Sequence, residues 1–133
     1  MNSPQRLREH PEDRLAASAQ LVDLFAMADT LRAEAHASVA GHRQMAVARH
    51  GPVTSILYAF ELNGMLKEHH ADGEVLLQVL RGRLDITVGV AVHTMGAGTL
   101  LALAPGVPHS VRALQASDML LTVHRVSDDV AAT

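Results

Sequence analysis

Turn-forming residues recur at short intervals through residues 41–125, and this spacing constrains the fold more than any other feature of the sequence. Each of the predicted turns contains a residue suited to a positive or a fixed φ angle. The turn signals are Gly51-Pro52, Asn63-Gly64, Asp72-Gly73, Gly82, Gly89, Gly96 with Gly98, Pro105-Gly106 and Ser117-Asp118. The segments between them are too short for helices of ordinary length, so this region is predicted to be built from strands.

The segments between the turns are apolar and number eight. They span residues 43–49, 53–62, 75–80, 84–88, 92–95, 99–103, 109–114 and 119–125. The segment at 84–88 alternates apolar and polar residues, which is typical of a strand with one face on a core and one in water. Eight strands with no helical pattern between them predict a sandwich or closed barrel rather than a parallel α/β sheet. The fold class is therefore mainly β.

The segment at 53–62 differs from the others because it is apolar on both faces. Ile56, Tyr58 and Phe60 alternate with Leu57 and Ala59. A strand of this kind is covered on both sides, and the second cover is predicted to be a helix or another subunit. A homodimer is expected on this basis.

Residues 13–37 carry apolar side chains at helical spacing, among them Leu21, Leu24, Ala28 and Leu31. This pattern predicts an amphipathic helix, or two, which Gly41 would end. The chain is then one domain with an N-terminal arm and helix packed on the barrel at 1–40, the barrel at 41–127 and a tail at 128–133. A length of 133 residues leaves no room for a second domain.

The composition of the chain restricts the kinds of molecule that it is expected to bind. A net charge of -3, with 11 basic and 14 acidic residues interspersed, gives no basic surface for nucleic acid or anionic membrane. No stretch is apolar and long enough to cross a bilayer or to act as a signal peptide, so a cytoplasmic location is expected. The chain has no cysteine, which leaves histidine and carboxylate as metal ligands and makes its nine histidines notable.

Two stretches of the β region resemble the paired signatures of the cupin superfamily. The first runs from Leu66 to Gly82 and contains His69 and His70, and the second runs from Gly98 through Pro105-Gly106 to His109. In the family these read G-x5-H-x-H-x3,4-E-x6-G and G-x5-P-x-G-x2-H-x3-N. The resemblance implies a double-stranded β-helix, the cupin jelly-roll barrel, in which three His and one Glu of intact members hold a divalent metal.

The first signature is degenerate. Counting back from Gly82 places Val75 at the family's Glu, Ala71 at its second His and His69 at its first. Counting forward from Gly64 places His70 at the first His instead. The run into Gly82 is the more regular, and a slip of one residue would reverse every side chain, so His69 is favoured to face inward. Three carboxylates lie nearby in the sequence, and one of them could substitute for the lost ligand: Glu68, Asp72 and Glu74.

The resulting metal-ligand candidates are His69, His70 and His109. Imidazoles suit a divalent transition metal such as Zn, Fe, Ni, Mn or Cu. One hypothesis is a metal-assisted enzyme acting on a small molecule, with the substrate on an open coordination position. The alternative is a metal-free module that binds or senses a small organic ligand in an aliphatic barrel lined by Val75, Leu77, Val79 and Val111.

Two further questions stay open in the sequence. Whether the protein is an enzyme, and which residues would then be catalytic, does not follow from any motif. A third hypothesis makes the N-terminal helix a docking element for another protein. The remaining histidines are interpreted as solvated or structural: His10, His36, His42, His50, His93 and His124.

Overall fold

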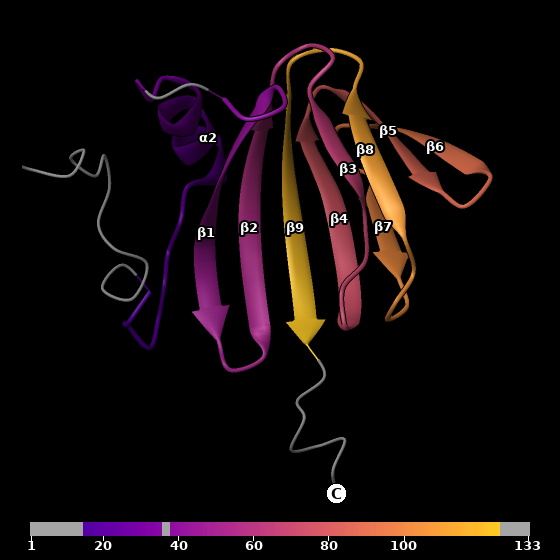
Figure 1. Ribbon diagram of the computed structural model, residues 1–133. Coiled ribbons are helices and arrows are strands. Elements are labelled where there is room, and N and C mark those ends of the chain that lie inside the picture. Colours follow the sequence, from indigo (N-terminus) through magenta and orange to yellow (C-terminus); the bar gives the residue numbers. More distant parts are fainter. Residues whose placement is uncertain (1–14, 36–37, 126–133) are drawn as a thin grey trace, which may run out of the picture.

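The chain folds into two antiparallel sheets that face each other, with one helix on the outside of the larger sheet (Figure 1). The structure is a computed structural model that describes residues 15–35 and 38–125. The larger sheet has the strand order β1-β2-β9-β4-β7, and the smaller has the order β3-β8-β5-β6. The elements are α2 (Leu24–Arg32), β1 (His42–His50), β2 (Val53–Phe60), β3 (Met65–His69), β4 (Gly73–Arg81), β5 (Arg83–Val88), β6 (Ala91–Gly96), β7 (Leu100–Leu103), β8 (His109–Ala113) and β9 (Ser117–Arg125). The mainly β fold class is confirmed.

Each of the eight predicted segments corresponds to a strand, with boundaries that differ by a few residues. The strand that the sequence did not predict is β3. Its residues Lys67 and Glu68 are exposed, and Leu66 and His69 are half-buried. A strand at the edge of a sheet with so little buried surface lacks the alternation that identifies strands in a sequence. This omission matters because β3 carries His69.

The main core fills the space between the two sheets. Strand β4 shows the pattern clearly, since Val75, Leu77 and Val79 are buried while the residues between them are exposed. The residues from the opposite sheet that meet them include Leu84, Ile86 and Val111, all of which are almost completely buried. Burial of alternate residues from two facing sheets is the arrangement expected of a jelly-roll barrel.

The N-terminal segment is less helical than the periodicity of residues 13–37 predicts. Within the described part of that range the helix is confined to Leu24–Arg32, where the Asp23 side chain accepts a hydrogen bond from the backbone N–H of Ala26. Residues 15–22 instead run along β1, where the Gln20 side chain accepts a hydrogen bond from the backbone of Arg49. Contacts to the free edge of β1 therefore take precedence over helical propensity in this segment.

Gly41 does not end the helix, which was the prediction. The helix ends at Arg32, with Ala33 as its C-cap, and Gly41 has a φ of 76° in the turn that joins Val39 to His42. Its positive φ angle serves a tight turn before β1 rather than a helix terminus. The predicted arm at 1–11 and the tail at 128–133 lie outside the described residues, so the division of the chain into these segments stays a prediction.

Helix α2 covers the second apolar face of β2. Ala28 and Leu31 are fully buried against Leu57 and Ala59, whereas Tyr58 and Phe60 point into the main core. The doubly apolar segment is thus covered by the helix, which was one of the two covers predicted. This contact takes away the surface that motivated the homodimer.

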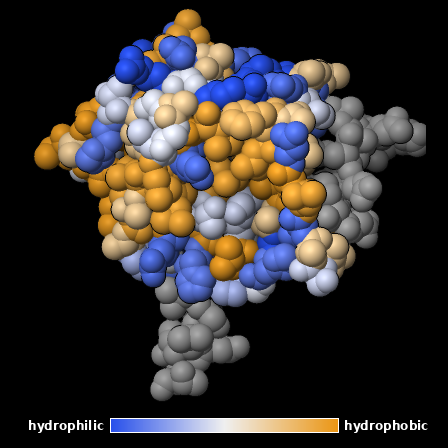
Figure 2. Space-filling view, turned by 180° about the vertical axis from the view of Figure 1, so that it is seen from behind, coloured by the Kyte–Doolittle hydropathy of each residue, from blue (hydrophilic) through white to orange (hydrophobic). Residues whose placement is uncertain are grey.

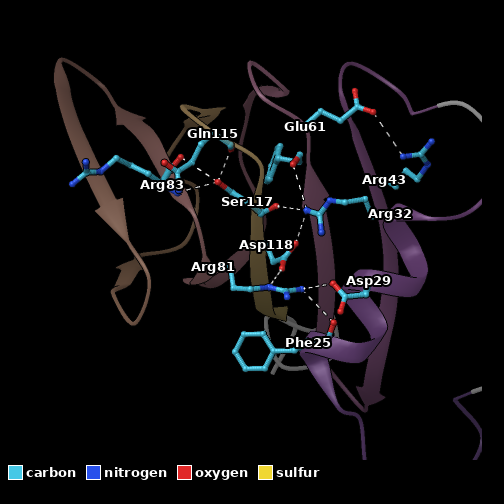
Figure 3. Close-up of polar contacts among 11 residues, drawn as sticks. Phe25, Asp29, Arg32, Arg43, Glu61, Arg81, Arg83, Gln115, Ser117 and Asp118 are labelled. Carbon is cyan, nitrogen blue, oxygen red and sulfur yellow. Dashed lines mark hydrogen bonds and ion pairs between the residues drawn. The ribbon is translucent and has the colours of Figure 1, made fainter.

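A buried carboxylate ties α2 to the sheet (Figure 3). Asp118 of β9 is 1% exposed, and Arg32 Nη2 donates to its Oδ1 at 2.7 Å while Arg81 Nε donates to Oδ2. Arg81 also reaches Asp29 of α2 at 2.8 Å and lies over the ring of Phe25. Two guanidinium groups therefore compensate one desolvated charge, and both connect the helix to strands far from it in sequence.

Within residues 15–35 and 38–125, no helix has the length and apolarity that a bilayer crossing requires.

Candidate functional site

Strands β3 and β8 bring His69 and His109 together. The two residues are partners in the β3–β8 register, and their ring centroids lie 4.2 Å apart at an interplanar angle of 60°. They are forty positions apart in the chain, so only the antiparallel pairing of these strands places them side by side. Two of the three metal-ligand candidates, His69 and His109, therefore lie side by side in the structure.

A β-bulge in β3 explains why the counts from Gly64 and from Gly82 predict different inward histidines. Leu66 pairs with Val111, and the register then shifts by one residue before His69 pairs with His109. Strict alternation from the inward-facing Leu66 would send His70 inward, but the extra residue of a bulge reverses the phase. The structure accordingly leaves His69 half-buried and His70 exposed.

His109 is held by the turn that precedes it. Its ring is 1% exposed, and Nδ1 lies 3.1 Å from the carbonyl oxygen of Val107. Gly106 has a φ of 80° in this turn, and Pro108 confines Val107 to extended backbone, which fixes the direction of that carbonyl. The other ring nitrogen, Nε2, is buried and has no hydrogen-bond partner among the residues that the structure describes.

His69 is oriented in the same way. Its Nδ1 lies 2.8 Å from the carbonyl oxygen of Lys67. Because a carbonyl oxygen only accepts, the proton of each neutral ring resides on Nδ1, and Nε2 presents a lone pair. The pKa of His109 is lowered chiefly by burial, against an opposing hydrogen bond to Val107, and the nearby His69 lowers it further. His109 is therefore a neutral hydrogen-bond acceptor at physiological pH.

Both rings line a cavity of about 170 Å³ inside the barrel. Ala71 and Val75, the residues aligned with the second His and the Glu of the cupin signature, line the same cavity. The count from Gly82 therefore identified the four positions that share one site. Two of them carry imidazoles and two carry hydrocarbon side chains.

The remaining lining residues come from β2 and β9, and the sequence did not predict them as site residues. They are Ile56, Tyr58, Leu121, Val123 and Arg125. The alternation of apolar residues in 53–62 places Ile56 and Tyr58 on one face, but nothing in the sequence showed that this face reaches the cavity. Burial raises the pKa of Tyr58, so its hydroxyl stays protonated. By contrast Leu77, Val79 and Val111, which were expected to line the site, are packed in the main core instead.

The other candidate ligands lie elsewhere. Glu68, Asp72 and Glu74 are exposed and do not line the cavity. Across the described ranges, no group of three or more His, Cys, Asp or Glu residues is arranged to hold a metal ion. The metal-binding roles predicted for His69, His70 and His109 stay predictions.

The histidines predicted to be structural or solvated are mostly as expected. His42 is buried, with Nδ1 3.0 Å from the carbonyl oxygen of Met65 and Nε2 3.1 Å from Gln44 Oε1. His50, His93 and His124 are exposed. His10 and His36 lie outside the described residues.

Two facing antiparallel sheets, the signature residues at one cavity and a helix outside the larger sheet define a cupin barrel. The sequence model of the AraC-like ligand binding domain family matches residues 50–121, and the chain belongs to this family. No curated protein matches the chain.

Solved structures agree on the fold. A conserved protein of unknown function from Streptococcus pyogenes is 17% identical with a TM-score of 0.66, over 84% of this chain and 91% of its own. A cupin superfamily protein from Desulfitobacterium hafniense is 18% identical with a TM-score of 0.66, over 85% and 96% of the two chains. The Bacillus subtilis oxalate decarboxylase, a protein with Mn(II) centres, is 19% identical with a TM-score of 0.55, over 66% of this chain and 26% of its own. At these identities the likeness shows the fold alone.

Proposed function

We propose that this protein binds a compact, mainly apolar organic molecule in the barrel cavity, and that the molecule donates a hydrogen bond to Nε2 of His109. The observation that carries the proposal is the buried, unpartnered Nε2 of His109, because a buried acceptor is normally satisfied by some donor. Membership of the AraC-like ligand binding domain family supports small-molecule binding in general.

The size and lining of the cavity narrow the ligand class. A volume of about 170 Å³ is close to that of an apolar cavity of about 150 Å³ that holds benzene in another protein. A ligand of roughly that size, with one hydroxyl or N–H group, would fill the hydrocarbon part and satisfy His109. A carboxylate in direct contact with Nε2 of His109 is disfavoured, because it would face the lone pair of a neutral imidazole, whereas Arg125 on the same lining carries a positive charge.

The donor set does not fit a resident metal. Protein sites for transition metals are usually completed by three or four protein ligands, and here two imidazoles face Val75 and Ala71, which donate nothing. We therefore propose that ligand binding is independent of metal, and that the protein acts as a binding or sensing module rather than as a metalloenzyme.

A second candidate function is binding of a divalent transition metal (Zn, Fe, Ni, Mn or Cu) by His69 and His109. The observation in its favour is that both rings donate Nδ1–H to backbone carbonyls, which is how metal-ligating histidines are commonly oriented. Exogenous ligands would have to complete the coordination shell, since His70 is exposed.

Matched probes distinguish the two functions. Phenol and fluorobenzene are similar in size, but only phenol donates a hydrogen bond. We expect phenol to bind about fivefold more tightly, equivalent to about 1 kcal/mol, and His109→Leu to erase this preference. His93→Leu, the same change at an exposed histidine, is the control and should leave both affinities unchanged.

The second candidate function, metal binding, is tested with untagged protein. Elemental analysis after incubation with each metal, together with thermal unfolding with and without chelator, measures metal binding directly. One metal per chain and a fall in Tm on chelation would favour the second candidate. Equal affinity of the wild type for phenol and fluorobenzene would refute the first.

A further inference from the structure

A second cavity lies outside the barrel, between residues 15–22, helix α2 and strand β1. Its volume is about 320 Å³, nearly twice that of the barrel cavity. The side chains that line it are hydrocarbon and thioether apart from one amide, and they include those of Leu15, Val22, Met27, Met45, Val47 and Gln20. The ligand site proposed above does not include any of these residues, and we call this space the Gln20 cavity.

The orientation of the Gln20 amide is fixed by the neighbouring strand. Gln20 Oε1 lies 3.1 Å from the backbone nitrogen of Arg49. A backbone N–H requires an acceptor, so the oxygen must be the atom that faces Arg49. Nε2 is then the other end of the amide, and it is buried with no acceptor among residues 15–35 and 38–125.

We propose that the Gln20 cavity is a second binding site, for a small molecule with an aliphatic body and an uncharged carbonyl oxygen. One N–H group of Gln20 Nε2 would donate to that oxygen and so give the buried amide nitrogen an acceptor. The volume of about 320 Å³ lies at the lower end of the range for small-molecule sites. Met27 and Met45 have flexible side chains that adapt to ligands of different shape.

The neutral character of the ligand follows from the lining. Among the described residues, none that lines the Gln20 cavity carries a cationic side chain. A carboxylate would therefore be desolvated there without a counter-charge, which is costly, whereas a ketone, ester or amide would not. The ligand class differs from that proposed for the barrel, where the unpartnered group, Nε2 of His109, is an acceptor and the ligand must be a donor.

The test uses protein labelled with ¹³C at the methionine methyl groups. Met27 and Met45 report on the Gln20 cavity, while Met95 and Met119, in the main core, report on the barrel. The probes are cyclooctanone and methylenecyclooctane, which have nearly the same shape but differ in the carbonyl oxygen. Both are larger than the molecules that a cavity of about 170 Å³ accommodates.

We expect cyclooctanone to shift the Met27 and Met45 signals saturably, and to bind about fivefold more tightly than methylenecyclooctane. Gln20→Glu keeps an oxygen for Arg49 but replaces the donor with a second oxygen, so it should abolish this preference. Gln20→Met, which removes the amide altogether, should abolish it as well. Gln78→Glu, the same change at an exposed position on β4, should leave the preference intact.

Three results would overturn the proposal. These are shifts confined to Met95 and Met119, equal affinities of the wild type for the two probes, and an undiminished preference in folded Gln20→Glu or Gln20→Met protein. The affinities for phenol at the barrel are measured separately, so failure here leaves the barrel proposal unaffected.

Discussion

His109 is a buried titratable group that is fixed at one ring nitrogen and unpartnered at the other. Its Nδ1–H donates to Val107, and Nε2 faces the interior. Protonation of Nε2 would place a charge in a largely hydrocarbon cavity, which is costly without a counter-charge. The state of this one ring therefore links pH to both stability and ligand binding.

The stability of the protein should depend on pH through His109. Burial lowers the pKa of His109 in the folded state, so the unfolded chain binds this proton more readily. The free energy of unfolding therefore rises with pH between the folded pKa and the unfolded value of about 6.5, and the stability is lost as the pH falls through that window. We expect acidification from about pH 7.5 to about pH 5.5 to lower the urea midpoint more in the wild type than in His109→Leu.

His93→Leu serves as the control for this measurement, because His93 is exposed. Its urea midpoints should follow those of the wild type at both pH values. Parallel pH dependence in the wild type and His109→Leu would show that His109 is not the responsible group.

Some residues of the barrel site could be predicted from the sequence, and others could not. Positions 69, 71, 75 and 109 could be predicted because the run into Gly82 and the turn before His109 keep their spacing. The choice between His69 and His70 could not be proved, since it depends on a bulge that has no clear sequence pattern. Tyr58 and Arg125 were missed because their contribution depends on how two distant strands curve around the cavity.

At the scale of elements, α2 is held by packing and by charge together. Ala28 and Leu31 bury the apolar face, and Arg32 and Arg81 share the carboxylate of Asp118. Sequence periodicity located the apolar face but overestimated the length of the helix. The turn signal Ser117-Asp118 predicted a turn at Asp118, which lies in β9 instead. No local pattern in the sequence shows that two arginines from other elements converge on this residue.

Removing one of those arginines should destabilise the protein more than an exposed charge would. Arg32→Met leaves Asp118 buried with only Arg81, and we expect the free energy of unfolding to fall by about 2 kcal/mol or more. Arg112→Met is the matched control, because Arg112 is exposed and its side chain donates a hydrogen bond to Asn63 Oδ1 at 3.3 Å. Chemical denaturation of both variants makes the comparison, and similar losses would contradict the role of Asp118.

The helix should be part of the folded unit rather than a free docking element. Leu31 is fully buried against β1 and β2, so Leu31→Ala should lower the free energy of unfolding by about 2–5 kcal/mol. Deletion of residues 1–40 should leave a barrel that aggregates, because it exposes Leu57 and Ala59. A truncated protein that did not aggregate and was as stable as the full chain would instead support the docking hypothesis.

At the scale of the whole molecule, apolar surface remains outside the helix and the cores. Hydrophobic residues occupy a broad area of the face seen in Figure 2, with hydrophilic residues along its margins. On the outer face of β4 and β7, Leu76 is 41% and Leu100 is 59% exposed, and β7 is the free edge of its sheet. Exposed apolar side chains beside an unpaired strand edge are the features of a self-association surface.

The homodimer stays a prediction, and β7 is the surface on which we expect it to form. Leu100→Lys should convert a dimer to a monomer, because it places a charge on the exposed apolar face of this edge strand. Size-exclusion chromatography with light scattering at micromolar concentration measures the mass of both proteins. A monomeric wild type would remove the prediction, and Arg112→Met provides a control at an exposed site away from β7.

The position of β9 has a consequence for how the chain reaches its native state. Strand β9 lies between β2 and β4, so the middle of the larger sheet is completed by the last strand in sequence order. Until residues 117–125 leave the ribosome, β2 and β4 each have an unpaired edge within reach of other nascent chains. The protein is accordingly expected to fold after, rather than during, synthesis of its β region, and to engage chaperones in that interval.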